Sequence, residues 1–259
     1  MKAKKRPGCL VIILIIVGVF ILIGIIGALL SDSPPETANN SDSKTTGANA
    51  SQKHEELFAE AQALLGQGKY IDAITAVDKA IKIEENAEYT KLKTDIEAKI
   101  KEKKTALEAK FEIKEDKVEK ISFISPVSEL DKGLVFYPYI GVNKSGKYMY
   151  LRVGYQEDAS KALFVFTSIK VRAGEELEEL KFNLLEKSND VDLLGAGMTE
   201  LVDIDVNKNT QKLLDNVVAS TEDVIVRFED ISNQITDYTI SKEQKQDIVD
   251  ILEYYSYLE

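Results

Sequence analysis

Residues 134–155 read LVFYPYIGVNKSGKYMYLRVGY, and this stretch carries the clearest fold signal in the chain. Hydrophobic side chains alternate with other side chains on both sides of the tetrapeptide NKSG. A four-residue turn that ends in glycine between two alternating runs is typical of a β-hairpin. We therefore predict two antiparallel strands, Leu134–Val142 and Lys147–Tyr155, with Tyr139 opposite Tyr150.

This register sorts the side chains of the hairpin into two faces. The face predicted to be core carries Phe136, Pro138, Ile140, Val142, Met149, Leu151 and Val153. The other face carries Tyr137, Tyr139, Tyr148, Tyr150 and Arg152. Tyrosine and arginine are enriched in binding interfaces because they are large, rigid and amphipathic. This face is therefore either a partner-binding surface for a peptide, a glycan or a protein, or a face that another helix or strand covers. Pro138 also indicates an edge strand or a bulge, since proline cannot donate to a ladder.

The sequence around the hairpin predicts a β-rich α+β domain over residues 113–259. Alternating runs predict further strands around Val118–Phe123, Leu163–Val171, Leu180–Leu184, Leu201–Val206, Val224–Phe228 and Ile235–Ile240. A short helix is predicted at Thr210–Ala219. Ser241 and Gln244 form a capping-box pattern that starts a closing C-terminal helix with an apolar stripe.

Residues 53–112 have the period of helices. Small side chains at Ala61, Ala73 and Ala80 flank the turn sequence Gly68-Lys69-Tyr70. Residues 53–86 in this way resemble a single tetratricopeptide repeat. The resemblance implies two antiparallel helices that pack closely at the small residues, and it suggests a peptide-binding groove.

Two features separate this segment from a full repeat array. Glu85 stands where the family usually has the proline that closes the repeat. The sequence shows no recognisable second repeat, and repeat proteins need about three to be stable alone. An apolar stripe from Tyr89 to Leu107 predicts instead a third helix packed on the pair. A plain helical hairpin remains the alternative interpretation.

Residues 9–30 predict a transmembrane helix. The run from Cys9 to Leu30 has 22 residues without a charge or a polar amide, and as a helix it spans roughly 33 Å, enough for a bilayer core. A cleaved signal peptide has a shorter apolar region of about 7–15 residues and a small-residue cleavage site. A lipoprotein signal needs its cysteine after the apolar run, whereas Cys9 precedes it. We expect an uncleaved anchor that contacts the lipid bilayer through residues 9–30.

Basic residues set the predicted orientation. Residues 1–8 form a basic tip with three lysines and one arginine, and no further basic residue follows until Lys44. The positive-inside rule then places the N-terminus in the cytoplasm and the later domains outside the membrane. Residues 31–52 are rich in Ser, Thr, Asn, Ala and Pro and predict a disordered linker. The part predicted to lie outside the membrane, residues 53–259, contains no cysteine and so no disulfide. This fits a bacterial envelope protein better than a secreted eukaryotic domain.

Composition excludes several kinds of chemistry. One Cys and one His among 259 residues rule out an intrachain disulfide framework and Cys- or His-rich metal sites. The outer part, residues 53–259, has 28 basic and 41 acidic residues and a net charge of −13, which argues against nucleic-acid binding. His54 lies where the linker meets the first predicted helix, and we expect it on the surface.

Three weaker motifs favour structural interpretations. Asp203, Asp205, Asn207 and Asn209 have the spacing of a calcium loop, but its sixth and twelfth positions are not Gly and an acid, so a helix N-cap is favoured. The glycines of Gly195-Ala196-Gly197 indicate a turn. The glutamates near Leu177 and Leu180 lie in a run that we expect to be solvated: Glu175, Glu176, Glu178 and Glu179.

No catalytic residue, cofactor site or metal site is predicted. We expect a single-pass membrane-anchored scaffold or binding protein that mediates protein–protein contacts at the cell envelope, with another envelope or membrane protein as its partner. The alternative is a membrane-tethered ligand sensor or regulator. The candidate partner-binding residues are those of the tyrosine face: Tyr137, Tyr139, Tyr148, Tyr150 and Arg152.

Overall fold

The structure, a computed structural model, describes residues 46–127, 133–158, 166–182, 187–192 and 197–258. The chain divides into two units, Met1–Ala48 and Asn49–Glu259. None of the described helices combines the length and apolar character that a membrane crossing needs. The predicted spanning segment and the basic residues before it lie outside the described residues, and so does most of the predicted linker.

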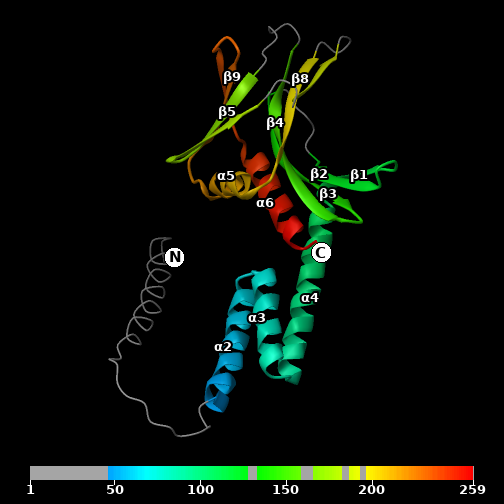
Figure 1. Cartoon of the computed structure of the whole chain (residues 1–259), viewed down its shortest axis with the longest axis vertical. Coiled ribbons are helices and arrows are strands. Elements are labelled where there is room, and N and C mark those ends of the chain that lie inside the picture. Colours follow the sequence, from blue (N-terminus) through cyan, green and yellow to red (C-terminus); the bar gives the residue numbers. More distant parts are fainter. Residues whose placement is uncertain (1–45, 128–132, 159–165, 183–186, 193–196, 259) are drawn as a thin grey trace, which may run out of the picture. The chain divides into compact units, whose positions relative to one another are not determined.

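Three helices precede two antiparallel sheets, and a helix closes the chain, which confirms the α+β class (Figure 1). The helices are α2 (Thr46–Gly66), α3 (Tyr70–Ile83), α4 (Ala87–Glu108), α5 (Lys208–Ala219) and α6 (Lys242–Ser256). The strands of the six-stranded sheet, in spatial order, are β1 (Phe111–Asp116), β2 (Ile121–Pro126), β3 (Gly133–Asn143), β4 (Gly146–Asp158), β8 (Gly197–Asp205) and β7 (Lys187–Asp192). Those of the four-stranded sheet are β10 (Ile235–Thr239), β9 (Val224–Asp230), β5 (Phe166–Ala173) and β6 (Glu176–Lys181).

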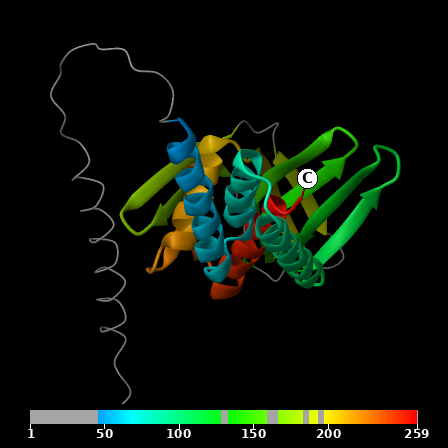
Figure 2. The same ribbon diagram turned by 90° about the horizontal axis from the view of Figure 1, so that it is seen from below.

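Helices α2, α3 and α4 lie side by side (Figure 2) and share one core. Ala61, Ala73 and Ala80 are fully buried there, where a larger side chain would push the helices apart. Gly68 has a φ of +75° in the turn between α2 and α3, a conformation that glycine adopts without steric cost. The three helices are thus hairpin-like, as the resemblance to a tetratricopeptide repeat implied. Helix α2 begins at Thr46, seven residues before the predicted start.

The predicted β3–β4 hairpin is confirmed in register. Tyr139 pairs with Tyr150, and Asn143 pairs with Gly146 across the turn. The apolar face of the hairpin is buried, with Val142 half-buried at its end. Strand β3 lies between β2 and β4 and is not an edge strand over its whole length, but its pairing with β2 ends at Ile140, so Pro138 lies where β3 pairs with β4 alone.

Helix α6 spans two hydrophobic cores. Its capping box at Ser241 and Gln244 forms as predicted. Ile248 packs into the core between the two sheets and α5, and Ile251 packs into a second core beneath β2, β3 and β4. This second core also holds side chains of α4, so α6 ties the helical segment to the six-stranded sheet.

Several strand predictions are shifted. Val118 lies in a turn and is 86% exposed, because the Asp116 carboxylate accepts hydrogen bonds from the backbone N–H groups of Val118 and Glu119. The strand predicted at 180–184 is β6, which begins four residues earlier. Strand β7 was not predicted, since its sequence KSNDVD has no apolar alternation. The hairpin of β9 and β10 is confirmed.

Candidate binding face on the six-stranded sheet

The five side chains of the tyrosine face project together from β3 and β4, on the side of the sheet opposite α6. Helix α6 packs on the other side, where Ile140 and Met149 contribute to its core. All five side chains have intermediate exposure, neither buried nor fully solvated: Tyr137, Tyr139, Tyr148, Tyr150 and Arg152. We call this set the aromatic face.

Arg152 is held firmly on the aromatic face. Its Nε and Nη2 atoms each donate to one oxygen of Asp203, both at 2.8 Å. Its guanidinium carbon lies 4.9 Å from the centre of the Tyr139 ring, in cation–π geometry. The hydrogen bond to Asp203 is the main cause that raises the pKa of Arg152. A two-pronged ion pair with an aromatic backing fixes the plane of the guanidinium.

The rings form a connected cluster across three strands. Tyr139 stacks against Tyr150 at 5.7 Å between ring centres, and Phe123 of β2 lies 6.2 Å from Tyr139. Tyr148 meets Tyr150 edge-on at 5.5 Å. The Tyr148 ring covers Gly141, its partner in the β3–β4 register, so closely that a Cβ there would collide with it. An aromatic side chain that shields a strand glycine in this way stabilises the pairing.

The hydroxyls of Tyr139 and Tyr150 remain protonated at neutral pH. Burial is the main cause that raises the pKa of Tyr139, with the charge of Asp203 second. Burial, the charge of Asp205 and a hydrogen bond to Asp205 raise the pKa of Tyr150. Protonated hydroxyls that interact with the carboxylates of Asp203 and Asp205 are poor nucleophiles and poor bases.

A pocket opens beside the aromatic face where β2 and β3 stop pairing. Their ladder ends at the pair Ile124–Ile140, and the next two positions along it would bring Pro126 opposite Pro138. Neither proline has an N–H group to donate, so the ladder cannot continue through them. The pocket has a volume of about 480 Å³, and ligand sites commonly hold roughly 300–1,000 Å³. It is lined by Glu112, Lys114, Phe123, Ser125, Pro126, Tyr137, Tyr139 and Arg152.

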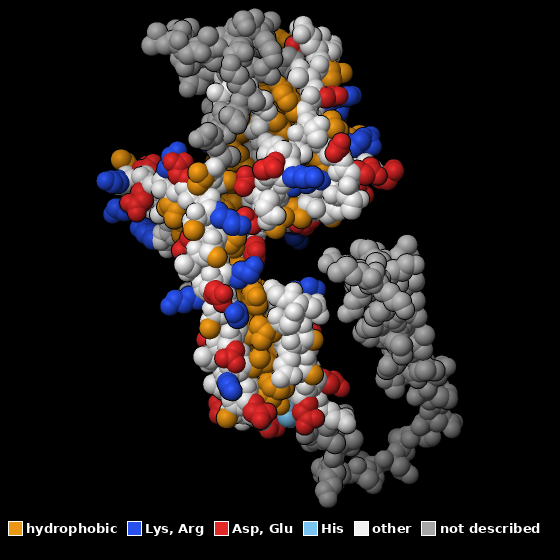
Figure 3. Space-filling view, turned by 180° about the vertical axis from the view of Figure 1, so that it is seen from behind, with side chains coloured by type: hydrophobic (Ala, Val, Ile, Leu, Met, Phe, Trp, Pro, Cys, Tyr) orange, Lys and Arg blue, Asp and Glu red, His pale blue; other side chains and the backbone are white. Residues whose placement is uncertain are grey.

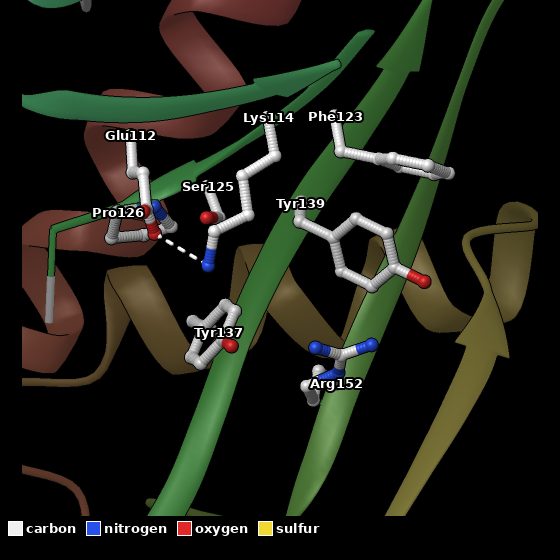
Figure 4. Close-up of a pocket in the computed structure, with 8 residues that line it drawn as sticks. All are labelled: Glu112, Lys114, Phe123, Ser125, Pro126, Tyr137, Tyr139 and Arg152. Atoms are coloured by element: carbon white, nitrogen blue, oxygen red, sulfur yellow. Dashed lines mark ion pairs between the residues drawn. The ribbon is translucent and has the colours of Figure 1, made fainter. Parts of the chain in front are cut away.

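Two cations reach into this pocket from opposite sides. Figure 4 shows Lys114 and Arg152 pointing toward the space between Tyr137 and Tyr139. Lys114 pairs with Glu112 at 3.0 Å, but the two side chains are 71% and 50% exposed. An exposed pair of this kind is weak and adaptable, whereas Arg152 is fixed by Asp203. The pocket thus combines aromatic walls, one rigid cation and one movable ion pair.

The structure confirms the structural interpretation of the acidic loop. Asn207 is the N-cap of α5, and its side chain accepts from the backbone N–H groups of Asn209 and Thr210. In the part of the chain that the structure describes, no three His, Cys, Asp or Glu side chains gather as metal ligands. Of the predicted glutamate run, Glu176 and Glu179 are exposed on the edge strand β6. Gly195 and Ala196 lie outside the described residues.

The prediction that His54 lies on the surface is wrong. His54 is only 5% exposed, and its Nδ1 atom lies 2.7 Å from the Tyr89 hydroxyl. Its Nε2 atom lies 3.0 Å from a carboxylate oxygen of Glu84. His54 lies on the side of α2 that packs against Tyr89 of α4, and this packing removes it from solvent. Burial raises the pKa of Tyr89, and this contact joins the two helices.

The chain matches no protein-family model, no curated protein and no solved structure. No family model therefore confirms a tetratricopeptide repeat. The structure brings all five predicted face residues together and adds pocket residues from β1 and β2 that the sequence did not indicate. The two prolines within strands were the available signal for the break in the ladder.

Proposed function

We propose that this chain is a single-pass membrane-anchored protein that binds another envelope or membrane protein through its outer part. In this proposal residues 9–30 form the anchor, the N-terminus lies in the cytoplasm and residues 53–259 lie outside. The lysines and the arginine before the apolar run support that orientation.

The aromatic face is the observation that carries the binding role. Monomeric proteins usually bury their aromatic side chains, because each ring removes about 150–250 Å² of surface from water when covered. Here four tyrosines remain half-exposed on one side of a sheet, beside a pocket and an anchored arginine. A partner that covered this face would bury rings that are already rigid, at a low cost in side-chain entropy.

The helical segment supports a second contact. We propose that α2 and α3 form a single tetratricopeptide-like repeat. Figure 3 shows a strip of hydrophobic side chains running lengthwise along the helical segment, bordered by charged side chains. A depression of about 380 Å³ next to Tyr70 and Leu65 also includes Asp95 and Lys99. Apolar grooves of this kind accept helical or extended peptides.

Crosslinking on intact cells tests the proposal. A crosslinker that cannot cross membranes is applied to cells that carry the full chain, and the attached proteins are identified. We expect one dominant partner with the wild type and a yield at least fivefold lower with Tyr139→Ala plus Tyr150→Ala. The matched control is Ile225→Ala plus Ile235→Ala, on the outer face of the four-stranded sheet, which should leave the yield unchanged.

Three outcomes contradict this proposal. Equal yields from the wild type and the tyrosine variant would exclude the aromatic face as the contact. A tyrosine variant that fails to fold, judged by thermal unfolding, would show that the face belongs to the core. If the crosslinker reacts with the chain only after cell lysis, the orientation in the membrane is the reverse of the one proposed.

The pocket favours one alternative, a membrane-tethered ligand sensor. Its volume of about 480 Å³ would accommodate a small molecule or a sugar unit. The detergent-purified full chain would then retain a small molecule detectable by native mass spectrometry, and crosslinking would show no dominant partner.

A further inference from the structure

Arg152 shows how the aromatic face holds a cation. The guanidinium lies over one tyrosine ring, and the carboxylate directly across the ladder, Asp203, binds it from the side. A second carboxylate lies two residues further along β8, where Asp205 is across the ladder from a ring, Tyr150, and not from a cation. Tyr148 meets Tyr150 edge-on at 76°. We call the site formed by these two rings and the Asp205 carboxylate the second corner.

This second corner lacks the cation that the first one has. Within the described ranges, no lysine, arginine or histidine forms an ion pair with Asp205, which is exposed at the end of β8. The Tyr150 hydroxyl interacts with the Asp205 carboxylate, which orients it beside the rings without neutralising it. The Tyr148 ring rests on Gly141 and is thereby backed by the sheet.

We propose that Asp205, Tyr148 and Tyr150 bind an arginine side chain from a basic segment of the partner protein. This inference rests on the proposed function, because it assigns the chemistry of the contact made by the aromatic face. The bound guanidinium would combine the same two contacts that Arg152 makes, one with a tyrosine ring and one with a carboxylate.

The charge of the molecule favours a basic partner. Residues 53–259 have a net charge of −13, which attracts basic segments over a distance of about one Debye length, roughly 8–10 Å. Two carboxylates, Asp203 and Asp205, border the aromatic face, and its one cation, Arg152, is paired with Asp203. The charge of Asp205 is therefore left in excess. An anionic group at this corner would meet that carboxylate and be repelled. Arginine suits the corner better than lysine, because its planar group both stacks on rings and pairs with carboxylates.

The test uses the full chain in detergent micelles with ring-labelled tyrosines, observed by NMR. The probe is the blocked tripeptide acetyl-Gly-Arg-Gly-amide, and Tyr148→Phe and Tyr150→Phe variants assign the signals. We expect millimolar binding that shifts the signals of Tyr148 and Tyr150. Asp205→Asn keeps the shape of the side chain and should weaken binding about fivefold, whereas Asp205→Glu should largely preserve it.

Matched controls make the result specific to this corner. Asp223→Asn removes an exposed carboxylate next to β9 and should leave the affinity unchanged. The peptide acetyl-Gly-Glu-Gly-amide should shift neither ring signal. Equal affinity of the wild type and Asp205→Asn for the arginine peptide would overturn the inference, and so would shifts confined to Tyr137 and Tyr139.

Crosslinking with Asp205→Asn separates this inference from the proposed function. A yield that falls with both Asp205→Asn and the Tyr139/Tyr150 double variant supports both proposals. A yield that falls only with the double variant retains the aromatic face as the contact and rejects the arginine site. A yield that falls with neither variant rejects the proposed function itself.

Discussion

The two faces of the β3–β4 hairpin share one backbone and one register but differ in what covers them. On one face Phe136, Ile140 and Leu151 are completely buried beneath other elements. On the opposite face the tyrosines keep part of their surface in water. The difference is set by the elements that pack on each side, α6 above all, because the strands themselves present both faces equally.

The comparison teaches that alternation assigns side chains to faces but does not say which face is covered. Leu151 and Tyr150 are neighbours in sequence and point to opposite sides of β4. Burial of Leu151 contributes to folding through the hydrophobic effect. The rings of the aromatic face stabilise one another through edge and stacking contacts, and those contacts leave surface for a partner.

The largest expected effect comes from truncating the covered face. Leu151 is 0% exposed in the core between the sheets, so Leu151→Ala should lower the free energy of unfolding by about 2–5 kcal/mol. Tyr137→Ala, a truncation on the open face of the same hairpin, should lower the free energy of unfolding by less than about half of that amount. Chemical unfolding of the full chain in detergent measures both values. Equal losses would show that the two faces are equally buried and would remove the contrast.

Two glycines of the hairpin sharpen the comparison with a smaller effect. A Cβ at Gly154 would collide with the backbone carbonyl of Glu200 on β8, and a backbone group cannot move aside. A Cβ at Gly141 would collide only with the far end of the Tyr148 side chain, which can swing into solvent.

We therefore expect Gly154→Ala to destabilise the protein by about 1–3 kcal/mol and Gly141→Ala by clearly less. Gly141→Ala should instead displace the Tyr148 ring, visible as a shift of its NMR signal. The reverse order of stabilities would mean that the Tyr148 ring is fixed and that β4 and β8 can separate.

Local patterns predicted the hairpin because its information lies within 22 neighbouring residues. The NKSG turn fixes the register, and the register fixes the faces. The capping box of α6 and the N-cap of α5 are local for the same reason: each is a hydrogen bond between residues two or three positions apart.

The pocket and the buried histidine could not be predicted, because both depend on residues far apart in sequence. Lys114 and Tyr137 meet only because β2 pairs with both β1 and β3. His54 and Tyr89 are 35 positions apart, and their contact depends on how α2 and α4 pack. No pattern within one helix carries that information.

The smallest expected effect concerns the Arg227–Asp237 ion pair, which has the same two-pronged geometry as Arg152–Asp203. Its two hydrogen bonds are both 2.7 Å long, but it lies on the four-stranded sheet with side chains 45% and 42% exposed. The hydrogen bond from Arg227 is the main cause that lowers the pKa of Asp237 below 3.8. A carboxyl group with a lowered folded pKa stabilises the protein above its unfolded pKa, and this contribution is lost as the pH falls through the folded value.

Between pH 4 and pH 2 the wild type should therefore lose slightly more stability than Arg227→Gln, by less than about 1 kcal/mol because solvent screens the pair. Arg172→Gln on the neighbouring strand β5 is the matched control and should follow the wild type. Urea unfolding at successive pH values measures the three curves. Parallel curves for Arg227→Gln and the wild type would show that a two-pronged geometry without an aromatic backing adds nothing measurable. The contribution of Arg152 would then have to come from its contact with Tyr139, and the aromatic rings would account for the difference between the two ion pairs.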